Sequence, residues 1–132
     1  MATDTRVNYA IASAVDGNYE HAKAVVIDLI AEDYNNAEAH RAWAKVLLHE
    51  GKSTDSVAAY RVAVTLEPHD AGLQFEFAKA LVVQRQKYAM VALPNLIEAR
   101  EAVSAGLRLA PGDPQGLALR DQIEQSLKDS SS

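Results

Sequence analysis

Apolar residues recur along most of the chain at intervals of three and four residues, the period of an α-helix with one buried face. Residues 37–70 show two such runs, Ala39, Ala42, Trp43, Val46, Leu47 and then Val57, Tyr60, Ala63, Val64. Gly51 lies between the runs and Pro68 closes the second. Because glycine suits a tight turn and proline ends a helix, the pattern predicts two antiparallel helices here.

The same arrangement repeats at a distance of 34 residues. Gly17 and Gly51 are 34 residues apart, and so are Tyr9, Trp43 and Phe77 in succession. A fixed period of this length is typical of stacked helical repeats. We therefore expect one domain over 1–132, made of the following parts: repeat units at about 3–36, 37–70 and 71–113, a capping helix at about 114–128, and a frayed tail at 129–132.

The third unit contains an insertion. Pro68 and Pro111 are 43 residues apart instead of 34, so about nine residues are added within "VVQRQKYAMVALPNL". This stretch has no glycine, and its one proline suits a helix start. We expect a lengthened helix from Ala71 to about Met90, with Pro94 starting the next; a protruding loop is the alternative. Ser53, and Asp113 before Pro114, are expected to cap their helices.

These residues resemble the tetratricopeptide repeat (TPR) family, whose 34-residue helix-turn-helix unit has a large-small pair, a turn glycine, a second small residue, an aromatic and a final proline. In the middle unit these are Trp43 and Ala44, Gly51, Ser56, Tyr60 and Pro68. The resemblance implies an all-α fold, a right-handed superhelical solenoid of antiparallel helix pairs. It also implies a concave groove, lined by the first helix of each pair, that binds a peptide of a partner protein.

Composition and charge narrow the function classes. The chain has 48% hydrophobic residues, many of them alanine, which favours helices, and its net charge of −5 argues against nucleic acid as a partner. Residues 1–36 carry six acids and two bases, whereas 71–111 carry three acids and five bases. Neither a signal sequence nor a membrane-spanning stretch is visible, so we expect a cytoplasmic protein that does not insert into membranes, or a fragment of a longer one.

Catalytic chemistry is not expected. There is no cysteine, and the four histidines, read as surface residues, lack the spacing of a metal site. No carboxylate pair, phosphate-binding loop or serine nucleophile has the sequence context that its chemistry needs. We therefore expect no enzyme activity, no metal and no cofactor.

A binding surface is expected instead, on one face of the first helix of each pair. Helical spacing, together with the groove that the resemblance implies, selects Val7 and Ile11, then Arg41, Lys45 and Leu48, then Phe75, Lys79 and Val82. We expect an apolar side chain of a peptide near Phe75 or Ile11 and a carboxylate near one of the three cations. The alternative is that the apolar residues pack against a further domain or the inserted segment.

Some members of the family hold a chaperone's C-terminal tail with lysines and asparagines. Here those positions carry Val7, Ile11, Ala42, Gly72 and Glu76, so this co-chaperone role is not expected. Two alternatives to a monomeric adaptor stay open. One is a self-assembling scaffold, a homo-oligomer in which an acidic first unit meets a basic third unit. The other is a bacterial chaperone for secretion or cytochrome maturation that holds the tail of a client.

Overall fold

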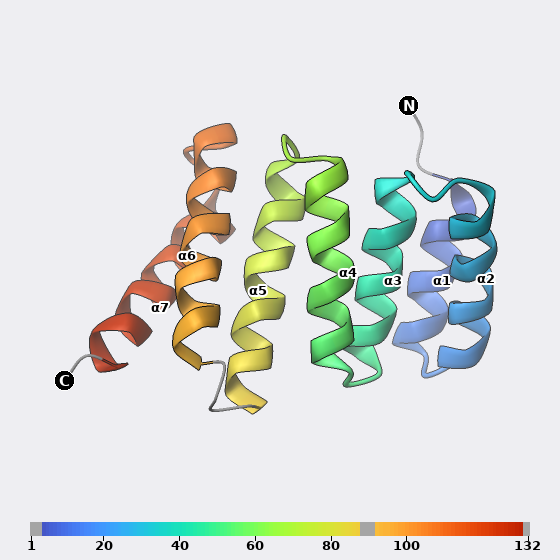
Figure 1. Ribbon diagram of the computed structural model, residues 1–132, viewed down its shortest axis with the longest axis horizontal. Coiled ribbons are helices and arrows are strands. Elements are labelled where there is room, and N and C mark those ends of the chain that lie inside the picture. Colours follow the sequence, from blue (N-terminus) through green and yellow to red (C-terminus); the bar gives the residue numbers. More distant parts are fainter. Residues whose placement is uncertain (1–3, 88–91, 131–132) are drawn as a thin grey trace. The chain divides into compact units, whose positions relative to one another are not determined.

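The computed structural model describes residues 4–87 and 92–130 of the chain (Figure 1). Within these residues the chain is all α-helical, without a strand. The helices are α1 (Thr5–Val15), α2 (Tyr19–Glu32), α3 (Ala37–His49), α4 (Ser53–Leu66), α5 (Ala71–Lys87), α6 (Ala92–Leu109) and α7 (Pro114–Ser130). The last helix extends two residues beyond the expected end at Lys128, and residues 131 and 132 lie outside the described part.

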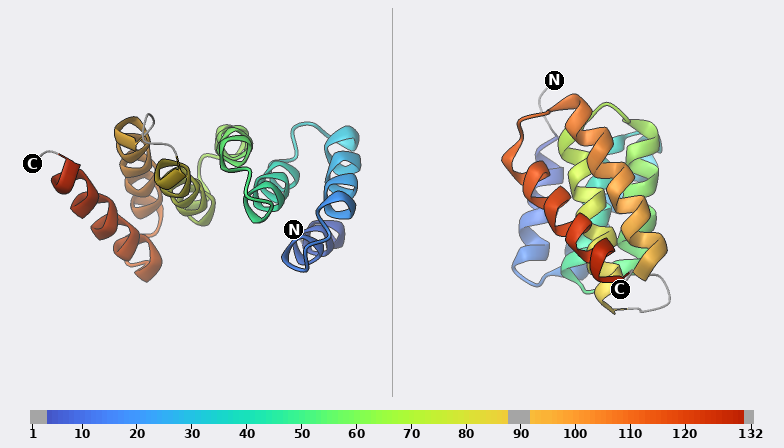
Figure 2. Two further views of the ribbon diagram at one scale, coloured as in Figure 1. Left: turned by 90° about the horizontal axis from the view of Figure 1, so that it is seen from below. Right: turned by 90° about the vertical axis from the view of Figure 1, so that its left-hand side faces the viewer.

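The chain divides into two compact units, Met1–Glu67 and Pro68–Ser132. In the first unit α1 pairs with α2 and α3 with α4, and α3 also packs against both helices of the first pair. In the second unit α5 pairs with α6, and α7 packs mainly on α6 and also touches α5. Figure 2 shows each helix pair as a hairpin, with α7 lying obliquely against α6.

The core of the first unit is built from small and branched side chains. Its buried cluster contains Val7, Ala10, Ala14, Ala22, Val26, Leu29, Ala39, Ala42 and Val46, contributed by α1, α2 and α3. Alanine at the crossing points lets the helix backbones approach closely, and the branched residues fill the remaining space. Ser56 of α4 is also fully buried, and its hydroxyl donates to the carbonyl of Ala44 at 2.7 Å.

The turn glycines have the predicted conformation. Gly17 and Gly51 have φ values of +88° and +87°, in the left-handed region that other residues adopt at a cost. The predicted cap at Asp113 is also confirmed, since its carboxylate accepts from the amide of Gly116 at 2.9 Å. The prediction for Ser53 is wrong. Lys52 occupies the cap position, and the Ser53 hydroxyl is buried without a hydrogen bond among the described residues.

Polar contacts fix the second hairpin on the first. Lys23 of α2 places its ammonium group 3.1 Å from the carboxylate of Glu50, at the turn between α3 and α4. The Tyr19 hydroxyl donates to the carbonyl of His49 at 3.2 Å, near the same turn. These contacts hold the turn ends of the two hairpins together, so that α1 and α3 are kept side by side in one unit.

The insertion lengthens both helices of the third hairpin. α5 has 17 residues where α3 has 13, and α6 has 18 where α4 has 14, so each gains about one helical turn. The predicted long helix is therefore present as far as Lys87, and its expected end at Met90 lies outside the described residues. The next helix begins at Ala92, which places Pro94 in its first turn, where proline is tolerated.

A buried amide joins the two lengthened helices. The Asn95 side chain donates to the carbonyl of Leu81 at 3.1 Å and to the side-chain oxygen of Gln84 at 2.8 Å. Asn95 and Gln84 are both buried. The amide donor of Asn95 on α6 and the side-chain oxygen of Gln84 on α5 therefore form a hydrogen bond with each other instead of with water. This pairing fixes the register of α5 against α6 in the added turn.

Phe75 is the central side chain of the second unit. It is 4% exposed, and its ring lies against Gly106 of α6 and Gly116 of α7. A Cβ atom at Gly116 would lie 2.5 Å from the ring carbon Cζ, which is too close. The ring fits here only because both positions are glycine. The ring therefore holds α5, α6 and α7 together.

The large residues of the repeat have different environments. Trp43 packs half-buried against the core cluster of the first unit and Phe77 is buried, but Tyr9 is 55% exposed. The expectation of four surface histidines is wrong for His40, which is 5% exposed. Its ring is held inside because Nε2 donates to the carbonyl of Tyr34 at 2.6 Å.

Candidate functional site

Four of the expected groove residues are partly exposed on neighbouring helices of the first unit. Ile11 lies on α1, and Arg41, Lys45 and Leu48 follow one face of α3 at helical spacing. The Arg41 guanidinium lies 3.3 Å from the carboxylate of Glu38, one turn earlier on α3. The first unit therefore presents Ile11 on α1, and on α3 it presents Leu48 with two basic side chains, one of which is paired with Glu38. This combination suits a ligand with an apolar and an anionic group.

Three other residues expected in the groove are buried. Val7 belongs to the core cluster of the first unit, and Phe75 fills the space beside Gly106 in the second. Val82 is also buried. These side chains are not accessible to a ligand in this structure. Lys79, in contrast, is exposed on α5.

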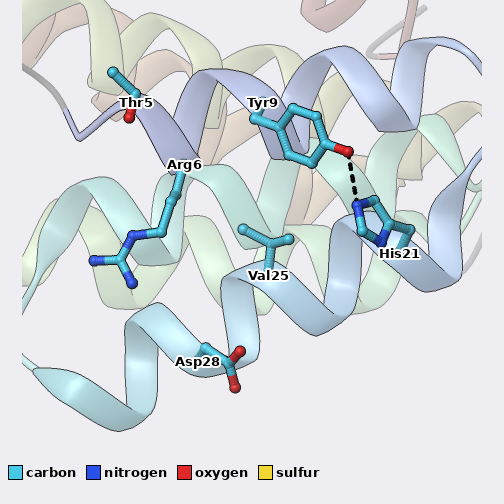
Figure 3. A pocket seen from close by; sticks show the side chains of 6 residues that line it. All are labelled: Thr5, Arg6, Tyr9, His21, Val25 and Asp28. Carbon is cyan, nitrogen blue, oxygen red and sulfur yellow. Dashed lines mark hydrogen bonds between the residues drawn. The ribbon is translucent and has the colours of Figure 1, made fainter.

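The structure also contains a groove that the sequence did not predict, between α1 and α2 (Figure 3). It has a volume of about 630 Å³ and is lined by Thr5, Arg6, Tyr9, His21, Val25 and Asp28. Val25 lies in the middle, with Tyr9 and His21 at one end and Arg6 and Asp28 toward the other. We call this the α1–α2 groove.

An aromatic contact forms one end of the α1–α2 groove. The rings of Tyr9 and His21 meet edge to face, with centroids 5.3 Å apart. A hydrogen bond of 2.9 Å joins the Tyr9 hydroxyl and Nε2 of His21. This bond links the exposed Tyr9 ring of α1 to α2 at that end of the groove.

Charged residues form the other end. Arg6 contacts Asp4 and Glu32, each at 2.8 Å. The hydrogen bonds from Arg6 lower the pKa of both carboxyl groups. The same hydrogen bonds, first the one to Glu32 and then the one to Asp4, raise the pKa of the guanidinium. Arg6 is thus neutralised by two acids, and together with Asp28 this end of the groove carries a net charge of −2.

A second pocket of about 410 Å³ lies in the same unit. Its lining comes from α2, the segment after α2, α3 and α4: Ile30, Tyr34, His40, Trp43, Leu47, Asp55, Ala58, Ala59 and Val62. The rings of Tyr34 and His40 meet edge to face, with centroids 4.9 Å apart. We call this the second-hairpin pocket. Sequence reasoning missed it because it treated Trp43 only as a packing residue.

Within residues 4–87 and 92–130, no group of three or more His, Asp or Glu residues is placed to hold a metal ion. Among the same residues no helix is long and apolar enough to cross a membrane.

The paired helices, the small residues at their crossings and the left-handed turn glycines define a class of protein, the all-α proteins with a TPR-like fold. Known structures of TPR domains can be superposed on nearly the whole chain. The first TPR domain of human RPAP3 is 16% identical, with a TM-score of 0.79, and the match covers 96% of this chain and 92% of that one.

Two further structures of similar fold contain a bound peptide. The first TPR of Spaghetti (RPAP3), bound to the HSP90 peptide SRMEEVD, is 16% identical with a TM-score of 0.78, and the match covers 94% of this chain and 91% of that one. The Yersinia enterocolitica type III secretion chaperone SycD, in complex with a peptide of the translocator YopD, is 18% identical with a TM-score of 0.68, covering 97% and 93%. Neither a protein-family model nor a curated protein matches the sequence.

Proposed function

We propose that this chain is a non-catalytic, cytoplasmic interaction module that binds a peptide segment of a partner protein. The observation that carries the proposal is the partly exposed surface of α1 and α3, where Ile11 and Leu48 provide apolar contact beside Arg41 and Lys45. Proteins of the same fold bind peptides, as the HSP90 and YopD complexes illustrate. We call this surface the α1–α3 face.

Each part of the α1–α3 face has a defined role in the proposal. Ile11 and Leu48 contact an apolar side chain of the peptide, and the two cations of α3 attract a carboxylate. Lys79 lies on α5 in the second unit and is not part of this face. The buried Val7, Phe75 and Val82 act indirectly, by supporting the helices on which the exposed residues lie.

A selection from a random peptide library displayed on phage tests the proposal. Enriched peptides should combine an apolar residue with an acidic one, and Lys45→Glu should weaken them by roughly tenfold, which corresponds to about 1.4 kcal/mol. Lys128→Glu on α7 is the matched control, because it makes the same charge change on a different helix. Failure to enrich any peptide, or unchanged affinity of the Lys45 variant at low salt, would refute the proposed face.

The peptide SRMEEVD is a second probe. Because Val7, Ile11, Ala42, Gly72 and Glu76 occupy the positions where the family's lysines and asparagines hold such a tail, we expect it to bind no more tightly than a scrambled peptide of the same composition. Micromolar binding would show that the α1–α3 face recognises this tail by other contacts.

The chaperone alternative is favoured by the likeness to SycD. In that case the α1–α3 face holds a segment of one particular client. A client that aggregates alone and stays dispersed with this chain, but not with its Lys45→Glu variant, would support this narrower role. A self-assembling scaffold would instead show sedimentation that depends on protein concentration and on salt.

A further inference from the structure

The α1–α2 groove and the second-hairpin pocket are equivalent sites, one repeat apart. Five of the six residues that line the groove have a counterpart 34 positions later that lines the pocket. The pairs are Arg6 and His40, Tyr9 and Trp43, His21 and Asp55, Val25 and Ala59, and Asp28 and Val62. The same depression between paired helices is thus present in both hairpins.

The two sites differ in which segments line them. In the second-hairpin pocket, Ile30 from α2 and Tyr34 from the segment after it complete the lining. Tyr34 is fixed there by His40, through both its ring and its carbonyl group. Every residue that lines the α1–α2 groove, in contrast, comes from α1 or α2.

From this equivalence we propose that the α1–α2 groove is the docking site for an amphipathic α-helix of a partner protein. The residues that Ile30 and Tyr34 add to the second-hairpin pocket define the apolar part of that helix. The helix carries an aliphatic residue near its C-terminal end, as Ile30 does, and an aromatic residue four positions later, just after the helix ends, as Tyr34 does. A basic side chain nearby is a further requirement.

Each of the apolar side chains of the partner helix contacts particular residues of the groove. The aliphatic side chain packs against Tyr9 and Val25, the counterparts of Trp43 and Ala59. The aromatic ring lies against Arg6, where a cation takes the place of His40 and a cation–π contact replaces the contact between two rings.

The requirement for a basic residue comes from the acidic end of the groove. Asp28 stands where the second-hairpin pocket has the apolar Val62, and Arg6 is already neutralised by two carboxylates. A net charge of −2 attracts a lysine or arginine and repels an acidic helix. The groove therefore selects a basic helix, whereas the α1–α3 face selects an acidic peptide.

Synthetic helices provide the probe. The parent peptide has the sequence of residues 22–36, AKAVVIDLIAEDYNN, held helical by a side-chain staple on the face opposite Ile30 because so short a helix is unstable alone. A basic version carries Glu32→Lys and Asp33→Lys, and a third adds Tyr34→Ala to the basic version. Fluorescence anisotropy measures affinity for the full chain, and amide NMR shifts locate the bound peptide.

We expect the basic helix to bind to α1 and α2 at least about tenfold more tightly than the parent, because four units of peptide charge are changed beside an acidic site. Loss of the aromatic ring should weaken binding by about three- to fivefold, the size of an exposed cation–π contact. Val25→Glu in the protein should abolish binding. Ile27→Glu is the matched control, since Ile27 is 54% exposed on the same helix but does not line the groove.

A second protein variant tests the charge argument without disturbing the core. Asp28 is exposed, so Asp28→Lys should leave the fold intact, weaken the basic helix and strengthen the parent. No binding of any helix at millimolar concentration, or equal binding by the Val25→Glu and Ile27→Glu variants, would overturn the proposal. Self-association of the native chain that Val25→Glu abolishes would also overturn it, because the occupant would then be a second copy.

Discussion

The contact of Phe75 with Gly106 predicts that Gly106→Ala lowers the free energy of unfolding, although alanine normally stabilises a helix. A methyl group added at Gly106 would come nearest to Cε1 of the ring and would lie 2.8 Å from Cδ1 and 2.9 Å from Cζ. Carbon atoms normally meet at about 3.5–4.0 Å, so the ring or the helix must move by about 1 Å. The ring is buried and also touches Gly116, which leaves it little space on the other side.

Two opposing terms determine the effect of Gly106→Ala on the free energy of unfolding. Overpacking of this kind costs about 1–3 kcal/mol. Alanine is more favourable than glycine inside a helix by about 1 kcal/mol, which offsets part of that cost. The difference is a net loss between about 0 and 2 kcal/mol, and the close contact with the ring places the expected loss toward the upper end. When Phe75→Leu removes the ring, the same change should become neutral or stabilising, so the two substitutions should be coupled by about 1–3 kcal/mol, the cost of overpacking.

Urea unfolding measures this loss. Far-UV circular dichroism follows all helices, and the fluorescence of Trp43, the one tryptophan of the chain, reports on the first unit. Gly72→Ala is the control, because it lies in the first turn of α5 and its added Cβ would meet only Asp70, at an ordinary distance of 3.5 Å. If Gly106→Ala stabilises the chain as much as Gly72→Ala does, the glycines are not required by the ring and the reasoning fails.

Three further predictions concern other elements. Gly51→Val should lower the free energy of unfolding by about 2 kcal/mol or more, because a β-branched residue is strained at φ +87°; urea unfolding measures it. Arg6→Gln should reduce the loss of stability between about pH 5 and pH 2, because the lowered pKa values of Asp4 and Glu32 give stability above their unfolded pKa values that protonation removes; melting temperatures at both pH values show this. Asn95→Ala should cost about 1–3 kcal/mol, because it removes the two buried hydrogen bonds that the Asn95 amide donates to α5; thermal unfolding tests it.

Each of these has its own control. Gly112→Val, at a glycine without the left-handed conformation and with open space around it, should be tolerated far better than Gly51→Val. Arg120→Gln on α7 removes an exposed arginine without changing the pH dependence in the same way. An Asn95→Ala variant as stable as the native chain would show that the α5–α6 register does not depend on the buried amide.

The helical hairpins could be predicted because their signals are local. The left-handed turns follow from Gly17 and Gly51, and the period of 34 residues relates Tyr9, Trp43 and Phe77. Helix ends were less certain, because capping depends on a neighbouring backbone. Ser53 has the right side chain for a cap but lies one residue inside α4, where its hydroxyl is buried.

The binding surface was predicted less well because helical spacing defines a face but not its neighbours. Val7 and Phe75 lie at groove positions by spacing, yet both are buried once the other helices pack on them. The α1–α2 groove was missed for the opposite reason. The counterpart of Trp43 in the first repeat is Tyr9, and only the structure shows that this residue is left exposed.

The lengthened third hairpin shows which insertions this architecture tolerates. In an antiparallel pair, residues added to one helix alone would leave its last turn without a partner along its side. Here α5 and α6 each gain four residues, so their ends stay level and Asn95 can reach across the new layer. Hairpins of this kind should therefore change length during evolution in balanced steps of about one turn per helix, and a deletion confined to α6 should be harder to accommodate than a matched deletion from both helices.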